Sequence, residues 1–265
     1  MLGTQDTLLE ELIIQTLMPA AFRIFRNSAL ACWLAAAASL FAQGPADRNV
    51  ELTRPIVSND KVFEEVEGIL AVEAEHFYRQ TLTDKRAFYI TSSARQPRLT
   101  PDPDGPHDAG ASGGTYVEVL PDTRATHDDP LVHGTNFSKQ GGGMATLHYK
   151  VHFNTPGRYY VWCRVFSTGT EDNGVHFGLD GAWPESGQRW QTTKKRAWSW
   201  DSRQRTAENH QGEPFGLYLD VPTAGAHEIM ISMREDGFEI DKWALALNRD
   251  FTPQDTGPEP RLKSP

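Results

Sequence analysis

The stretch Asn154–Phe166, NTPGRYYVWCRVF, combines a turn signal with a strand pattern. Asn, Pro and Gly at positions 154–157 are typical of a turn, and the residues that follow are rich in aromatic and β-branched side chains. In a strand, successive side chains point to opposite faces, which separates Tyr159, Val161, Cys163 and Val165 from Tyr160, Trp162, Arg164 and Phe166. The stretch therefore predicts a strand over 158–167, with Cys163 as a buried core thiol.

Similar short segments recur along the chain. No stretch that follows the N-terminal region shows a sustained helical periodicity of apolar residues. The predicted strands are 69–77, 86–91, 115–119, 144–153, 158–167, 174–180, 215–221, 226–233 and 238–247. Breakers such as Asp180-Gly181 and Pro222-Thr223-Ala224-Gly225 separate them. This pattern indicates an all-β protein, an antiparallel β-sandwich with Greek-key connections.

Composition limits the organisation and the partners. With 265 residues, 38% hydrophobic residues and a net charge of −9, the chain fits one globular domain with irregular ends. We expect an N-terminal extension and signal peptide over 1–42, a flexible lead-in over 43–68, the sandwich over 69–250 and a flexible tail over 251–265. The acidic balance argues against nucleic acid or an acidic membrane as partner, because either requires a basic surface.

The N-terminal region reads as a signal peptide. Arg23 and Arg26 precede the apolar run 29–41, and Ala42 offers a small-residue cleavage site. The apolar run is shorter than the roughly 20 residues that a membrane-spanning helix needs. Translation could start at Met18 instead of Met1. We expect cleavage after Ala42 and an exported protein, placed in the periplasm, at the cell surface or outside the cell.

Cleavage after Ala42 would leave Cys163 as the single cysteine of the chain. No intramolecular disulfide is then possible, so the domain must be held together by its core. A lipid anchor on Cys32 is an alternative fate of the N-terminal region.

The predicted strand 69–77, ILAVEAEHF, carries two carboxylates. Glu73 and Glu75 would lie side by side on one face of that strand, where two negative charges repel. A cation between them is one explanation. Exposure of both side chains to water on an edge strand is the other.

Four tryptophans gather between residues 183 and 200, in a segment whose Pro, Gly, Ser and Lys content predicts an irregular loop. Exposed indoles often form a platform on which sugar rings stack. Lys194, Lys195 and Arg196 in the same segment could pair with carboxylates or sulfates of a polysaccharide. Alternatively, the loop uses its tryptophans as its own small core.

Four motifs, in this order, resemble the β-sandwich carbohydrate-binding modules of families 6 and 35: AVEAEHF, NTPGRYYVWCRVF, DNGVHFGLDG and AGAHEIMISMREDGFEIDKWALAL. They are also similar to the related C-terminal domain of family 115 glycoside hydrolases. The resemblance covers about residues 69–248, and it implies a β-sandwich of the jelly-roll, galactose-binding-like type.

This resemblance implies a structural calcium ion, whose matching ligand positions are Glu73, Glu75 and Asp241. It also implies a sugar site at loops on one end of the sandwich, built from aromatic side chains and an asparagine. The candidate carbohydrate-binding residues are Tyr116, Asn173, Trp183, Arg189, Trp190, Trp198 and Trp200. Tyr116 could instead be a core residue, and the face with Trp162 and Arg164 is an alternative location for the site.

Motifs of catalysis are missing from the sequence. The histidines show no HExxH spacing, and no Gly-x-Ser-x-Gly elbow or phosphate-binding glycine loop occurs. We therefore expect non-catalytic binding of an oligosaccharide or polysaccharide, which could be anionic. The alternatives are a polysaccharide-degrading enzyme or its accessory subunit, and a surface adhesion module that binds protein.

Overall fold

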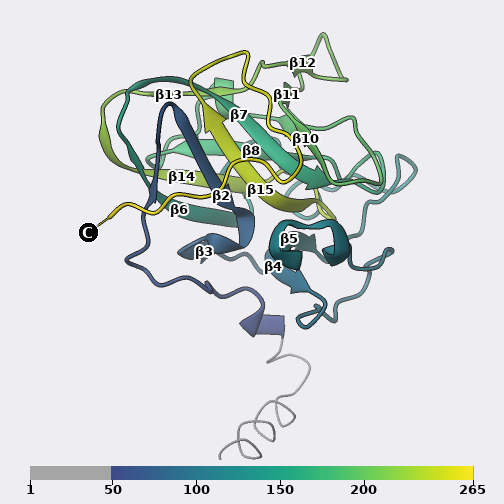
Figure 1. The fold of residues 1–265 in the computed structure, drawn as a ribbon. Coiled ribbons are helices and arrows are strands. Elements are labelled where there is room, and N and C mark those ends of the chain that lie inside the picture. Colours follow the sequence, from purple (N-terminus) through teal and green to yellow (C-terminus); the bar gives the residue numbers. More distant parts are fainter. Residues whose placement is uncertain (1–48, 265) are drawn as a thin grey trace, which may run out of the picture. The chain divides into compact units, whose positions relative to one another are not determined.

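Two β-sheets pack face to face in residues 49–264, the part of the chain that this computed structural model describes (Figure 1). The first sheet has eight strands: β1 (Phe63–Glu64), β3 (Arg79–Thr81), β6 (Thr146–Phe153), β8 (Gly174–Leu179), β9 (Trp190–Gln191), β11 (Arg203–Gln204), β12 (Glu213–Pro214) and β14 (Gly225–Met233). The second has seven: β2 (Ile69–Glu73), β4 (Ala87–Ser92), β5 (Thr115–Leu120), β7 (Gly157–Phe166), β10 (Ser199–Asp201), β13 (Tyr218–Val221) and β15 (Glu239–Ala246). The predicted all-β sandwich is confirmed.

Strand pairing is antiparallel apart from β1, which runs parallel to β6. The first sheet has the order β1-β6-β14-β8-β9-β11-β12, with β3 also on β6, and the second has the order β10-β7-β15-β5-β4, with β13 on β7 and β2 on β15. Short 3₁₀ helices lie in the connections: η1 (Ala74–His76), η2 (Asp108–Gly110), η3 (Ser112–Gly114) and η4 (Glu185–Gly187). Strand β15 is central, because β2, β5 and β7 all pair with it.

The main core fills the space between the sheets. The alternation in β7 places Val161, Cys163 and Val165 in this core, where each is at most 1% exposed. From the facing sheet, β6 contributes Tyr149, whose ring centroid lies 5.0 Å from that of Trp243 on β15. Burial of such side chains stabilises the fold by about 1.5–3 kcal/mol each. The prediction that Cys163 is a core thiol is confirmed.

Both ends of the predicted domain differ from expectation. Residues 43–68 and 251–265 were expected to be flexible, yet Phe63 on β1 is 3% exposed and belongs to the core. The backbone amide of Lys263 donates to the carbonyl of Val62 at 2.9 Å, so the two ends hold each other. The two contacting segments are about 200 residues apart in the sequence, so no local sequence pattern indicates the contact. For this reason the sequence predicts two flexible ends.

The predicted signal segment, residues 1–42, lies outside the described residues. Within residues 49–264, no helix is long and apolar enough to cross a membrane.

Candidate functional site

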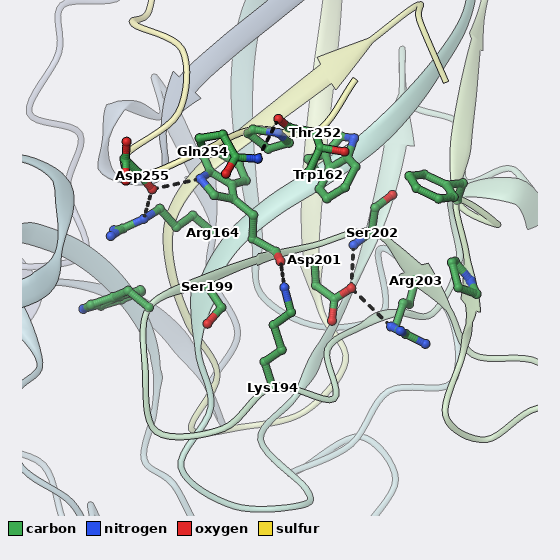
Figure 2. Close-up of a pocket in the computed structure, with 15 residues that line it drawn as sticks. Trp162, Arg164, Lys194, Ser199, Asp201, Ser202, Arg203, Thr252, Gln254 and Asp255 are labelled. Atoms are coloured by element: carbon green, nitrogen blue, oxygen red, sulfur yellow. Dashed lines mark hydrogen bonds and ion pairs between the residues drawn. The ribbon is translucent and has the colours of Figure 1, made fainter. Parts of the chain in front are cut away.

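A hollow lies on the outer face of the seven-stranded sheet, between β7, β10 and the C-terminal segment (Figure 2). Because the neighbouring residues of β7 face the core, Trp162 and Arg164 point to the opposite side. Strand β10 pairs with β7 so that Trp200 lies opposite Arg164. The alternation visible in NTPGRYYVWCRVF thus builds the core with one set of side chains and the hollow with the other.

Aromatic rings form the apolar part of this hollow. Trp162 and Trp200 pack over Ala71 of β2 and Ala244 of β15, whose small side chains leave room for the two indoles. Phe215 lies edge-on to Trp162, with ring centroids 5.6 Å apart. The hollow has a volume of about 690 Å³, and Trp198 also lines it.

Charged groups surround the rings. Lys194 Nζ donates to the carbonyl of Trp200 at 2.6 Å, and Arg203 Nε lies 3.3 Å from Asp201 Oδ1. Arg164, Lys194 and Arg203 line the hollow together with only two carboxylates, those of Asp201 and Asp255. Its lining therefore carries a small excess of positive charge, although the chain as a whole is acidic.

The C-terminal segment forms one wall of the hollow. The carbonyl oxygen of Asp255 accepts hydrogen bonds from Trp200 Nε1 at 3.1 Å and from Arg164 Nε at 3.0 Å. Figure 2 shows Asp255 beside Arg164 at this wall. Gly257 has a φ of 76°, and a Cβ at this position would come within 2.3 Å of the Trp200 ring. Glycine is thus needed here both for the backbone conformation and for the close approach. The expected flexible tail is part of the candidate site.

Two of the predicted carbohydrate-binding residues, Trp198 and Trp200, lie in the hollow. Tyr116 and Trp190 do not, because both are 0% exposed. Trp190 packs against Phe238 in the main core, with ring centroids 5.8 Å apart. Tyr116 packs edge-on against Trp198, with ring centroids 5.3 Å apart. For these two residues the prediction of an exposed platform is wrong. Tyr116 fits the alternative of a core residue, whereas Trp190 belongs to the main core between the sheets and not to a small core of the loop's own.

Trp183 and Arg189 are placed away from the hollow. The half-buried Trp183 ring covers Gly141, Gly142 and Gly178, where an added Cβ would come within 3 Å of the indole. Arg189 forms an ion pair with Glu185, and its Nε donates to the carbonyl of Arg205 at 2.9 Å. Both side chains are therefore engaged in local packing.

Asn173 lines a second hollow, of about 460 Å³, near the ends of β8 and β14. Its side-chain amide donates to the carbonyl of Thr170 at 2.9 Å. Four cations line this second hollow, but two of them already pair with its carboxylates, in the ion pairs Arg124–Glu171 and Arg234–Glu235. Asn173 thus lines a different hollow from Trp198 and Trp200.

The predicted calcium ligands lie where β2 and β15 meet, but not on one strand face. Strand β2 ends at Glu73, and Glu75 lies in η1, so the expected strand over 69–77 is wrong beyond Glu73. Glu73 Oε1 is 2.7 Å from Nζ of Lys242, its cross-strand partner, which is 0% exposed. Asp241 accepts from Arg164 Nη1 at 2.5 Å and from the amide of Ser112 at 2.7 Å.

Lysine and arginine thus already neutralise two of these three carboxylates. Glu73 Oε2 and Glu75 Oε2 are buried without a hydrogen-bond partner, which leaves oxygen atoms that suit a hard cation. Burial, with the charges of Glu73 and Asp241 adding to it, raises the pKa of Glu75 to about 9. Burial likewise raises the pKa of Asp241 to about 6, although Arg164 opposes this shift.

No protein-family model matches this chain. The protein named uncharacterized protein P23 from Formosa agariphila is 52% identical over 212 residues, which make up 80% of this chain and 51% of that protein. The chain spans about half the length of this relative.

Solved structures with a similar fold include carbohydrate-binding modules of families 6 and 35. One is a Podospora anserina β-(1,4)-mannanase with a family 35 module, matched at 14% identity and a TM-score of 0.39 over 72% of this chain and 30% of that chain. Another is the C-terminal family 6 module of LamC, a marine laminarinase from Zobellia galactanivorans, matched at 13% identity and a TM-score of 0.34 over 67% of this chain and 98% of that chain. The relation to family 115 stays a prediction.

Proposed function

We propose that this protein binds an oligosaccharide or polysaccharide, without chemistry, in the hollow formed by β7, β10 and the C-terminal segment. The observation that carries the proposal is the arrangement of Trp162, Trp198 and Trp200 around one surface hollow with cationic side chains at its edge. The resemblance of the sequence to carbohydrate-binding modules points in the same direction.

Stacking on an indole removes the apolar face of a pyranose ring from water. At about 25 cal/mol per Å², even a modest contact area contributes on the order of 1 kcal/mol per platform. Polar groups at the edge then fix the orientation of the sugar. Rings and polar groups are both present in the hollow, where the half-buried Trp198 offers more ring surface than Trp162 and Trp200, each 6% exposed.

We further infer that the ligand is anionic. Lys194 and Arg203 lie at the edge of the hollow, and Arg203 carries a planar guanidinium suited to carboxylate and sulfate groups. A uronic acid or a sulfated sugar would complement this charge. A neutral glucan would leave it unused.

Trp198→Ala is expected to weaken glycan binding about fivefold or more, because it removes a platform that contributes on the order of 1 kcal/mol. The ligand would first be identified on a glycan array at neutral pH with calcium, and affinities then measured by calorimetry. Trp183→Ala is the matched control, since it removes a half-buried indole that lies outside the hollow.

Other outcomes of this experiment favour other functions. If Asn173→Ala weakens binding and Trp198→Ala does not, the site is the second hollow. Shortened glycans would favour a polysaccharide-degrading enzyme, and the absence of any glycan signal would favour the adhesion module.

We also propose that the protein is exported and that calcium binds at Glu73, Glu75 and Asp241. The free oxygens of Glu73 and Glu75 support the calcium proposal. The glycan array described above would identify the sugar, and the source of that glycan would then indicate whether a catalytic partner acts on it.

Export predicts a defined N-terminus. Mass spectrometry of the secreted protein should find a chain that begins near Gln43, because the small residue Ala42 closes the signal pattern. A soluble intracellular protein that retains residues 1–42 would contradict this proposal.

A further inference from the structure

Two buried glutamates face each other on the outer side of the seven-stranded sheet. Glu118 of β5 and Glu239 of β15 are direct cross-strand partners, and they are 4% and 1% exposed. Directly opposite side chains in an antiparallel pair have Cβ atoms about 5 Å apart, so two ionised carboxylates here repel strongly. Burial makes this repulsion costly unless positive charge compensates it.

The loop before β5 adds two more carboxylates. Oxygen atoms of Asp102, Asp104 and Glu118 lie within 4.8 Å of one another, and so do ligand atoms of Asp104, His107 and Glu239. Asp104 belongs to both groups and joins them. We call Asp102, Asp104, Glu118 and Glu239 the carboxylate cluster.

Several other buried carboxylates of the domain, among them those closest along β15 and in the loop before it, have a cationic partner. Asp236 is paired with Arg86 at 2.8 Å, and Asp241 is paired with Arg164. Among residues 49–264, no lysine or arginine nitrogen lies within 4.0 Å of a carboxylate oxygen of the cluster. The cluster therefore concentrates negative charge without the compensation found elsewhere in the fold.

Unpartnered atoms point to a missing ligand. Glu239 Oε2 and Asp102 Oδ1 are buried and have no hydrogen-bond partner. The other oxygen of Glu239 is held by His107 Nδ1 at 2.7 Å, and the His107 ring stacks on Phe166 with centroids 3.7 Å apart. His107 thus fixes the Glu239 carboxylate while leaving Oε2 free.

We propose that the carboxylate cluster binds one hard divalent cation, with calcium as the best match. Calcium accepts six to eight oxygen ligands, mono- or bidentate, and four carboxylates supply at least half of them. Oxygen-only donors favour calcium, manganese or magnesium over zinc, and His107 acts as a positioning residue through its bond to Glu239. This site is separate in its residues from Glu73, Glu75 and Asp241.

Calcium titration of a variant with only this site intact tests the proposal. The full chain carrying Glu75→Gln is freed of metal with a chelator, exchanged into metal-free buffer and titrated with calcium chloride in a calorimeter. We expect one calcium ion per chain. Adding Glu118→Gln and Glu239→Gln to the same background is expected to weaken calcium binding at least 100-fold.

Controls separate metal binding from a loss of fold. Glu64→Gln in the same background, a change on β1 far from the cluster in sequence, should leave the affinity unchanged. Without calcium, the Glu118→Gln/Glu239→Gln variant should melt no lower than its parent, because the amides relieve the repulsion, and calcium should raise only the melting temperature of the parent.

The proposal is overturned if the Glu75→Gln chain binds no calcium, or binds it equally well after the two cluster substitutions. Binding of zinc but not of calcium would overturn the assignment to a hard cation. Because calcium stoichiometry is measured without a glycan, the result is independent of the proposed sugar site.

Discussion

Replacing Trp190 with alanine is expected to lower the free energy of unfolding by about 3–5 kcal/mol, the range typical of a large aromatic truncated in a core. The side chain is 0% exposed, packs against Phe238 and belongs to the cluster between the sheets. Its removal loses the transfer free energy of the indole and leaves a cavity that the two sheets cannot fully close. Urea denaturation at constant pH measures the change.

Trp190→Phe is the matched control for this truncation. It retains most of the apolar volume, and the indole Nε1 it removes has no hydrogen-bond partner to lose. The loss of stability should therefore be clearly smaller than for alanine. A change of less than about 1 kcal/mol for Trp190→Ala would mean that the indole is not in the core.

The pH dependence of the free energy of unfolding is expected to show that Glu75 is protonated in the folded protein at neutral pH. In the folded protein its pKa is raised to about 9 from an ordinary value of 4.5, mainly by burial. Between these two pH values Glu75 holds a proton in the folded state that it lacks in the unfolded chain, so its contribution to stability is fully present below about pH 4.5 and is lost as pH rises toward 9. This group contributes a slope of about 1.4 kcal/mol per pH unit.

Between pH 6 and pH 8, in the presence of a chelator, wild type should thus lose about 2–3 kcal/mol more than Glu75→Gln. Urea denaturation at the two pH values measures both slopes. Equal slopes would contradict a buried, protonated Glu75. If calcium binds the ionised carboxylate, adding calcium at pH 8 should restore more stability to wild type than to Glu75→Gln.

Long strands were predictable because their periodicity spans many residues. Strand β7, expected over 158–167, is found at Gly157–Phe166, and β14, expected over 226–233, is found at Gly225–Met233. In each of them an alternating pattern and a turn residue agree. Strands β9 to β12 contain only two or three residues each, which is too short for any period to show.

The site was only half predictable for a related reason. Proximity in sequence grouped Trp190 with Trp198 and Trp200, but Trp190 continues the first sheet and Trp200 lies on the second. The role of Asp255 depends on a tertiary contact with Trp200 from 55 residues away. Likewise, Glu118 and Glu239 meet only because β5 pairs with β15. No local sequence pattern predicts this pairing.

Cys163 offers a chemical view of how the domain opens. Its thiol is fully buried in the core on β7, while its sequence neighbours Trp162 and Arg164 face the hollow on the other side of the sheet, and burial raises the thiol pKa well above its ordinary value. A thiol reagent therefore reacts only with molecules whose sheets have transiently separated. Since a ligand in the hollow binds only the closed form, it slows this reaction in proportion to the occupied fraction. The labelling rate of one native cysteine thus reports occupancy of the hollow without a fluorophore or an engineered tag.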